Sequence, residues 1–378
     1  MRKIVIITGS RGEYGYIRPI IKLISEDFDL DYDLIVTNMH LLDEFGYSVS
    51  EIEKDGFKIS AKHYMALEGY TNLTMVKSLG IFLQSLPETI DRLQPDIILV
   101  SGDRGEQLMA ALVGTHMNIP VVHIQSGEVS GNIDGIIRHA ITKLSHIHLV
   151  SNRDAYDRVK KMGEDEFRIY ETGAPQLDEL SEKKYTEELE LIEKYDIDRN
   201  KKLILFVQHP VTEEFHATNE QVKQTMIALN KLNEPCIIIN PNCDAGSNKI
   251  KKTISDYTTD KMKIYKNLPR KDYLGLMKIC TIMVGNSSSG LIESPFFGVP
   301  AVNIGNRQRG RIQGNNIINT SYNSEDIYNA LKLGMSTEFK TKIKSDSPYG
   351  DGKSSYRIVN ILKNIKIDNK LVNKRIVY

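Results

Sequence analysis

The segment Val284-Gly-Asn-Ser-Ser-Ser-Gly-Leu-Ile-Glu293 joins an apolar run to a turn of small polar residues and then to a helical pattern. The run Thr281-Ile-Met-Val-Gly285 predicts a buried strand, and residues 286–290 predict the turn. In such a turn, amides and hydroxyls converge at a helix N-terminus, where the helix dipole favours negative charge. The alternative is an ordinary strand-to-helix turn whose serine caps the helix. The segment therefore predicts an α/β unit with a candidate phosphate seat at residues 286–290.

The same alternation of strand and helix patterns extends along the chain. Short apolar runs between helical patterns predict parallel strands joined by right-handed crossovers. The predicted strands are residues 3–8, 33–37, 96–101, 121–125, 203–208, 236–240, 282–285 and 301–304. A charged helical stretch, residues 177–202, separates the two groups, so we expect a junction near Pro175. This organisation predicts two doubly wound, Rossmann-like domains, 1–175 and 176–378, facing a ligand cleft, with a last helix that can pack back on the first domain.

Composition limits the class of ligand and the location of the protein. The 378 residues carry 49 Lys plus Arg and 49 Asp plus Glu, so no net field attracts nucleic acid or an anionic membrane. An anion site must therefore be local, and we expect a small ligand. No run approaches the roughly 18 apolar residues of a membrane span. Cys236, Cys243 and Cys280 lack metal-ligand spacing, as expected of core thiols in a reducing cytoplasm. The basic segment after Lys363 is expected to be solvated.

Polar residues follow the predicted strands of the first half, where a parallel sheet presents side chains to its cleft. The first strand leads into Thr8-Gly-Ser-Arg-Gly-Glu-Tyr-Gly15, whose glycines admit a ligand and whose Arg11 could meet a phosphate. A plain turn is the alternative there. Ser101-Gly-Asp-Arg-Gly-Glu106 places Asp103 beside Arg104 at the end of the third strand. Asp103 either faces the cleft or caps the next helix.

The segment from His123 to His146 combines a Gly-interrupted loop with an amphipathic helix. Glu128 and Asp134 lie in the loop, and Asp134 is either a cleft residue or the N-cap of the helix. His139 and His146 are expected to be structural histidines. Two acids beside one strand end make this loop a candidate for a chemical role.

The second half supplies further polar groups beside the seat. His209 ends one predicted strand, where it either faces the cleft or packs structurally, and Asn242 follows the next strand. Glu293 could grip ribose hydroxyls, while Arg307 and Arg311 could neutralise a diphosphate. Acids and a base around a diphosphate seat, with neither metal-ligand spacing nor a nucleophile motif, favour proton transfer on a nucleotide sugar.

At these residues the chain resembles the hydrolysing UDP-N-acetylglucosamine 2-epimerases of sialic acid synthesis. The resemblance covers most of the length and rests on motifs that are weak singly but specific together. They are Thr8-Gly-Ser-Arg-Gly-Glu-Tyr-Gly, Gly102-Asp-Arg, Gly127-Glu-Val-Ser-Gly, Ile137-Arg-His-Ala-Ile-Thr-Lys-Leu-Ser-His, Gln208-His-Pro-Val-Thr, Asp244-Ala-Gly-Ser, Gly285-Asn-Ser-Ser, Asn303-Ile-Gly-Asn-Arg-Gln-Arg-Gly-Arg and Tyr349-Gly-Asp-Gly. The resemblance implies a glycosyltransferase-B-like pair of Rossmann-type domains, a nucleotide-sugar substrate, and neither metal nor nicotinamide nor another cofactor. We also expect a homodimer or homotetramer.

The resemblance also assigns roles to individual residues. Asp103 and Asp134 fall on catalytic carboxylates, and His209 falls on a diphosphate contact that we also count as a catalytic candidate. The expected nucleotide contacts are Arg11, Arg104, Asn242, Ser287, Ser288, Glu293 and Arg307, with the serines at the phosphates and Glu293 at the ribose. Gln125 stands where some members have a catalytic Glu, so Glu128 is the candidate for the missing carboxylate. Ser101 stands where His is common.

These departures leave the exact sugar open. One expected substrate is UDP-GlcNAc, giving ManNAc, and the other is a UDP-linked 2,4-diacetamido-trideoxyhexose on the way to legionaminic acid. The implied reaction eliminates UDP to a 2-acetamidoglycal and then adds water, with the acid and base roles of the carboxylates undecided. The rivals are a non-hydrolysing epimerase, a glycosyltransferase on the same fold and a nucleotide-sugar-binding regulator. Asp103 and Asp134 count against the regulator, which needs no acids.

Overall fold

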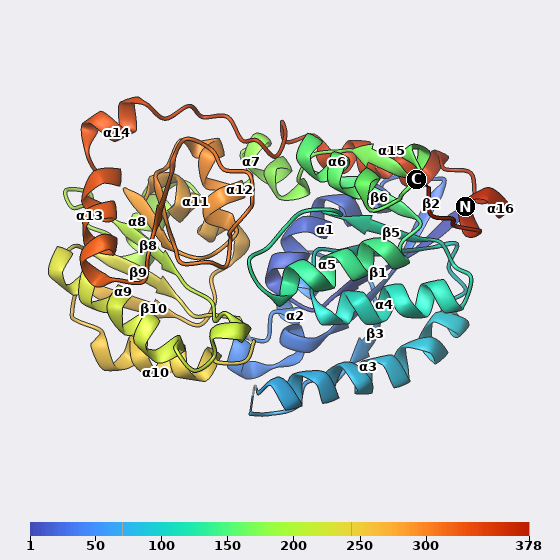
Figure 1. Cartoon of the computed structure of the whole chain (residues 1–378), viewed down its shortest axis with the longest axis horizontal. Coiled ribbons are helices and arrows are strands. Elements are labelled where there is room, and N and C mark those ends of the chain that lie inside the picture. The colour runs from blue at the N-terminus through green and yellow to red at the C-terminus, as the bar shows by residue number, and fades with distance from the viewer. Residues whose placement is uncertain (70, 243, 378) are drawn as a thin grey trace.

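The computed structural model describes residues 1–69, 71–242 and 244–377, which form two parallel sheets. The first sheet has the order β3 (Ile59–His63), β2 (Leu30–Thr37), β1 (Arg2–Thr8), β4 (Ile97–Ser101), β5 (Val121–Ile124), β6 (Ile147–Val150), β7 (Ile169–Glu171). The second has the order β10 (Met262–Tyr265), β9 (Cys236–Ile239), β8 (Ile204–Val207), β11 (Ile282–Gly285), β12 (Ala301–Ile304), β13 (Ile317–Thr320). Each order reverses beside its first strand, as in doubly wound folds. The predicted glycosyltransferase-B-like pair of Rossmann-type sheets is confirmed, and the two lobes are separate in Figure 1.

Helices cover both faces of each sheet. In the first lobe they are α1 (Arg11–Ser25), α2 (Val49–Lys54), α3 (Asn72–Leu93), α4 (Gly105–His116), α5 (Ile133–Leu144) and α6 (Arg153–Lys161), and the connection carries α7 (Asp178–Ser181) and α8 (Glu188–Tyr195). The second half carries α9 (Thr218–Leu232), α10 (Ser247–Tyr257), α11 (Arg270–Ile279), α12 (Ser289–Ile292), α13 (Ser324–Gly334), α14 (Thr337–Thr341), α15 (Ser354–Asn364) and α16 (Asn369–Val372). Short 3-10 turns are η1 (Asn38–Leu41), η2 (Asp43–Phe45), η3 (Glu166–Arg168), η4 (Pro175–Leu177), η5 (Thr212–Glu214) and η6 (Ser294–Phe297). Within the described residues, no helix has both the length and the apolar character needed to cross a membrane.

Apolar strands produce two cores per lobe because both faces of each sheet are covered. In β1, Ile4 and Ile6 pack toward α1, while Val5 and Ile7 pack on the opposite face. Cys236 and Cys280 are buried, as predicted for core thiols, and Cys243 lies outside the described residues. The cores fix the strand ends, and the strand ends present the polar loops.

The C-terminal segment returns to the first lobe, where α15 packs on α1 (Figure 1). Beyond it, Arg168 donates hydrogen bonds to the carbonyls of Leu371 and Lys370. The Lys374 ammonium lies 2.8 Å from Glu164 Oε2, with a side chain only 14% exposed. The expectation of a solvated segment after Lys363 holds for most of its described residues, which are exposed, but not for Leu371, which is buried, or for Lys374, whose ammonium reaches the buried carboxylate of Glu164.

Candidate active site

A cavity of about 240 Å³ lies between the two lobes and is lined from both. Ten of the eleven predicted site residues line it: Arg11, Asp103, Arg104, Asp134, His209, Asn242, Ser287, Ser288, Glu293 and Arg307. Glu128 does not. The cavity forms where the carboxyl ends of both parallel sheets meet, which is the usual ligand position in open α/β folds.

The phosphate seat follows β11 through a backbone that requires glycine. Gly285 has φ +129°, and a Cβ on it would lie 1.9 Å from Val207 O. The Asn286 side chain then ties the turn to β8, accepting a hydrogen bond from His209 N (2.7 Å) and donating one to His209 O (2.9 Å). The predicted helix begins at Ser289 but spans one turn only, so the helix dipole contributes less than the sequence suggested.

His209 reaches the cavity as a neutral donor. Burial, with Arg307, Arg11 and Arg104 nearby, holds the pKa of His209 well below its usual value. Nδ1 accepts a hydrogen bond from the Asn242 amide at 3.2 Å, so the proton of the neutral ring sits on Nε2. A neutral imidazole with Nε2–H suits donation to a phosphate oxygen more than general base work.

Charge in the cavity favours an anion although the whole chain is neutral. Among the described residues, seven arginines and five acids line the cavity: Arg11, Arg18, Arg104, Arg138, Arg270, Arg307 and Arg311 against Glu13, Glu51, Asp103, Asp134 and Glu293. Arg307 sits at the seat, donating to Asn286 O at 3.3 Å and to Asp134 Oδ2 at 3.3 Å. Guanidinium groups confined in a cleft recognise phosphate oxygens well.

Glu293, the expected ribose contact, is 3% exposed and paired with Arg270. Burial raises the pKa of Glu293, and Arg270 opposes the rise. Arg270 also lies 3.1 Å from Glu179, which lies 3.4 Å from Arg18 of the first lobe. This chain of ion pairs ties the candidate ribose end of the cavity to both lobes.

Asp103 lies in the loop after β4 and is not the cap of α4, because Arg104 occupies that position. Burial alone would raise the pKa of Asp103, but Arg138 and three further arginines outweigh burial and lower it. Arg138 pairs with Asp103 directly and donates to Gln125 O at 3.0 Å. Asp103 is therefore held as a carboxylate.

Asp134 lies in the first turn of α5, whose N-cap position belongs to Asn132. Burial and the neighbouring Asp103 raise the pKa of Asp134 to about 6, against the pull of Arg307. Two partly buried carboxylates whose pKa values shift in opposite directions are the pattern of an acid and base pair, because the group with the higher pKa keeps its proton to a higher pH. The site can thus accept one proton and donate another beside a phosphate seat.

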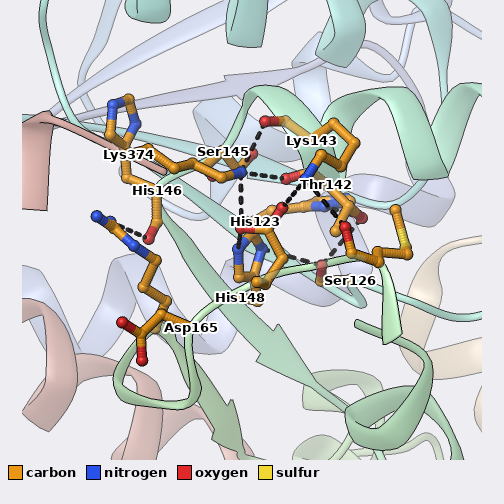
Figure 2. A network of polar contacts seen from close by, with 12 residues as sticks. His123, Ser126, Thr142, Lys143, Ser145, His146, His148, Asp165 and Lys374 are labelled. Atoms are coloured by element: carbon orange, nitrogen blue, oxygen red, sulfur yellow. Dashed lines mark hydrogen bonds and ion pairs between the residues drawn. The ribbon is translucent and has the colours of Figure 1, made fainter. Parts of the chain in front are cut away.

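A buried polar network holds the strand end and the helix that carry these acids (Figure 2). His123 on β5 bonds Gly102 O at 2.7 Å and Thr142 Oγ1 at 3.3 Å. Gly102 precedes Asp103, and Thr142 lies one turn beyond Arg138, so His123 joins the two partners of the ion pair. Burial lowers the pKa of His123 to about 3, and the ring is neutral. Ser126 continues the network from Thr142 to His148.

Glu128 lies outside the cavity wall, 3% exposed, with Arg311 Nη2 at 3.7 Å from its Oε2. His139 and His146 also lie off the wall, and His146 Nδ1 accepts from Val121 N at 3.1 Å, as a structural histidine does.

The sequence did not single out Arg138 or Arg270 as site residues, and Tyr16 was also missed. Arg138 is 1% exposed, and its one signal was the position four residues after Asp134, on the same face of a helix. Arg270 follows no predicted strand, and no local pattern marks it.

Comparison with known proteins places this geometry in a family. The model of the UDP-N-acetylglucosamine 2-epimerase family matches residues 22–363. The chain is 36% identical to the UDP-N,N'-diacetylbacillosamine 2-epimerase (hydrolyzing) of Legionella pneumophila, over 99% of both chains. It is 33% identical to a UDP-N-acetylglucosamine 2-epimerase of Neisseria meningitidis, over 100% of this chain and 99% of the other.

A solved structure has the same fold. It is UDP-GlcNAc 2-epimerase from Neisseria meningitidis bound to UDP-GlcNAc, with a TM-score of 0.82 at 18% identity, covering 95% of this chain and 99% of that one. The family match extends over most of the sequence and over both lobes that build the cavity. The chain belongs to the UDP-N-acetylglucosamine 2-epimerase family.

Proposed function

We propose that the protein is a hydrolysing 2-epimerase that converts a UDP-linked 2-acetamido sugar and water into UDP and the free C2-epimer. The observation that carries the proposal is the pair of partly buried carboxylates, Asp103 and Asp134, with opposite pKa shifts at a cavity that includes a phosphate seat. Full-length identity of 36% to a relative named as hydrolysing supports the release of free sugar.

In the first step Asp103 is the base. It takes the proton from C2, the C2–H electrons form the C1–C2 double bond, and the C1–O bond to UDP breaks. Arg307, the Nε2–H of His209 and the seat stabilise the charge that grows on the departing diphosphate. The product is a 2-acetamidoglycal.

In the second step Asp134 is the acid. It gives its proton to C2 from the opposite face while water adds to C1, and the proton lost by the water restores the Asp134 carboxyl. The proton that Asp103 took from C2 passes to the departing UDP or to solvent, which restores the Asp103 carboxylate. Diphosphate bound at Arg307 adds negative charge beside Asp134, which favours its protonated form. Neither step requires a metal or a nicotinamide.

Two sugars suit this chemistry. UDP-GlcNAc, giving ManNAc, is the first candidate. A second, side cavity of about 90 Å³ shares Arg104 and Asp134 with the main one and is lined by Met65, Leu67, Met75, Leu79 and Ile137 among others. This largely apolar lining favours a sugar with a 6-methyl group and a 4-acetamido group, so the 2,4-diacetamido-trideoxyhexose is the second candidate.

The test incubates the protein with each UDP-sugar in D2O, without added metal or NAD. We expect UDP and a free manno-configured sugar that carries one solvent deuterium at C2, because elimination breaks the C2–H bond. NMR of the isolated product reads both the configuration and the label. Protium at C2, UDP-ManNAc as the only product, or activity abolished by EDTA would contradict the proposal.

A further inference from the structure

Two loops, residues 128–134 of the first lobe and 306–311 of the second, meet across the cleft; together we call them the clasp. Gly131 N donates to Arg307 O at 2.8 Å, and Arg311 Nε donates to Val129 O at 2.7 Å. Arg307 Nη2 donates to Asp134 Oδ2 at 3.3 Å. Arg311 Nη2 also donates to Ser130 Oγ at 3.4 Å. The lobe that holds the phosphate seat therefore makes four hydrogen bonds to the loop that leads into Asp134.

The backbones in the clasp approach too closely for any side chain at residue 131. A Cβ on Gly131 would lie 1.8 Å from Asn306 O. Asn306 O is a backbone atom, so it cannot move aside as the end of a flexible side chain could. Gly131 itself is exposed, so its amide would exchange with solvent freely if the hydrogen bond to Arg307 O opened. The amide therefore reports the state of the clasp.

Glu128 lies beneath the clasp with no hydrogen bond to either carboxylate oxygen from the part of the chain that the structure describes. Its nearest cation is Arg311, whose side chain is 5% exposed and whose Nη1 likewise lacks an acceptor among the described residues. A buried carboxylate and a buried guanidinium 3.7 Å apart stabilise one another, and removing either leaves an uncompensated charge. The charge of Glu128 is thus balanced by Arg311, and Glu128 does not line the cavity.

We propose that Glu128 is a positioning residue: it holds Arg311 in the clasp, and the clasp sets Asp134 against the nucleotide-binding lobe. The inference rests on the proposed function, in which Asp134 transfers a proton. It replaces the expectation that Glu128 supplies the carboxylate absent at Gln125, because a group off the cavity wall acts through another residue. The clasp makes correct placement of the acid depend on the lobe that binds UDP.

The kinetic test compares Glu128→Gln, Arg311→Gln and the double variant across pH. Glu128→Gln is expected to lower kcat about 10- to 100-fold, a loss typical of small misplacement, while both limbs of the pH profile stay at their wild-type positions. The double variant is expected to be no slower than the slower single variant, because the pair acts as a unit. Loss of one limb in Glu128→Gln, or fully additive losses, would overturn the inference.

Hydrogen exchange tests the clasp without catalysis. In UDP-bound protein, the Gly131 amide is expected to exchange at least about tenfold faster in Glu128→Gln than in wild type. Asp272→Asn is the matched control, since Asp272 is a buried carboxylate off the cavity wall, bonded to Thr186 and Tyr195, and its loss should leave Gly131 unchanged. Unchanged Gly131 exchange in Glu128→Gln refutes the clasp whichever sugar is turned over. Faster exchange in a protein that hydrolyses neither UDP-sugar would instead refute the proposed function alone.

Discussion

The surroundings of Asp134 shift the pKa of its carboxyl toward the value that the proposed acid role requires. Burial and Asp103 raise its pKa to about 6, whereas Arg307 opposes the rise. Asp103, which lines the same cavity, keeps its charge because Arg138 pairs with it. In the proposed mechanism the same residue type thus serves as acid in one place and as base in the other, since the arginines are unequally shared.

Replacing Asp134 with Asn should remove the acid and with it one limb of the pH profile. In wild type, kcat is expected to fall as pH rises through the pKa of Asp134, because only the protonated carboxyl can protonate C2. Asp134→Asn should lower kcat about 100- to 10,000-fold, with UDP affinity nearly unchanged. Steady-state rates from pH 5 to 9 and calorimetry with UDP measure the two effects. Retention of the alkaline limb in this variant would assign the limb to another group.

For single residues, the sequence predicted which side chains lie at the cavity better than it predicted the role of each one. Asp103, Asp134 and His209 could be found because each follows an apolar strand or opens a helix, and strand ends gather at one edge. Glu128 also follows an apolar strand, yet its side chain lies beside Arg311 and not in the cavity wall. Arg138 sits within a helix, where local pattern does not distinguish a surface arginine from one that is 1% exposed.

Among the elements, the strands that the sequence missed have a common physical cause. β3, β7, β10 and β13 are sheet edges, where one side of the strand meets solvent and the apolar run is broken by polar residues. β6 is internal but carries His148, which bonds Glu164 at 3.0 Å. The central strands, buried on both faces, were predicted from their mainly apolar runs, although β5 also carries a histidine, His123.

β4 and α5 bring the two acids together only if their ends are held in register, and His123 on β5 joins them. His123→Leu should lower kcat about 10- to 100-fold with UDP affinity within twofold, because a small misplacement of Asp103 relative to Arg138 is costly. His123→Gln should restore part of kcat, since its amide can donate to Gly102 O.

His146→Asn serves as the control for this pair, because His146 accepts a hydrogen bond from Val121 N at the opposite end of the sheet. The kcat values and UDP affinities of the three variants show whether His123 positions Asp103. Equal loss of kcat in His123→Leu and His123→Gln would mean that the ring fills space rather than orients Gly102.

At the scale of the whole molecule, Glu164 joins the C-terminal segment to the first lobe. This buried carboxylate lies 2.6 Å from Lys143, 3.0 Å from His148 and 2.8 Å from Lys374 of the C-terminal segment. Burial alone would raise the pKa of Glu164, but His148 and the two lysines outweigh burial and lower it to about 2. A carboxyl whose folded pKa lies below its unfolded value stabilises the fold above the unfolded value, near 4.5, and loses that contribution as pH falls toward 2.

Glu164→Gln should therefore destabilise the protein by about 3–5 kcal/mol at pH 7, the usual loss when one partner of a buried pair is removed. The gap between variant and wild type should narrow as pH falls from 4.5 toward 2, because wild-type Glu164 becomes neutral there as well. Urea unfolding of both proteins at several pH values measures the gap. Glu338→Gln, which breaks an exposed pair with Lys342, should change stability little at any pH. A gap that stays constant below pH 4.5 would show that Glu164 contributes packing rather than charge.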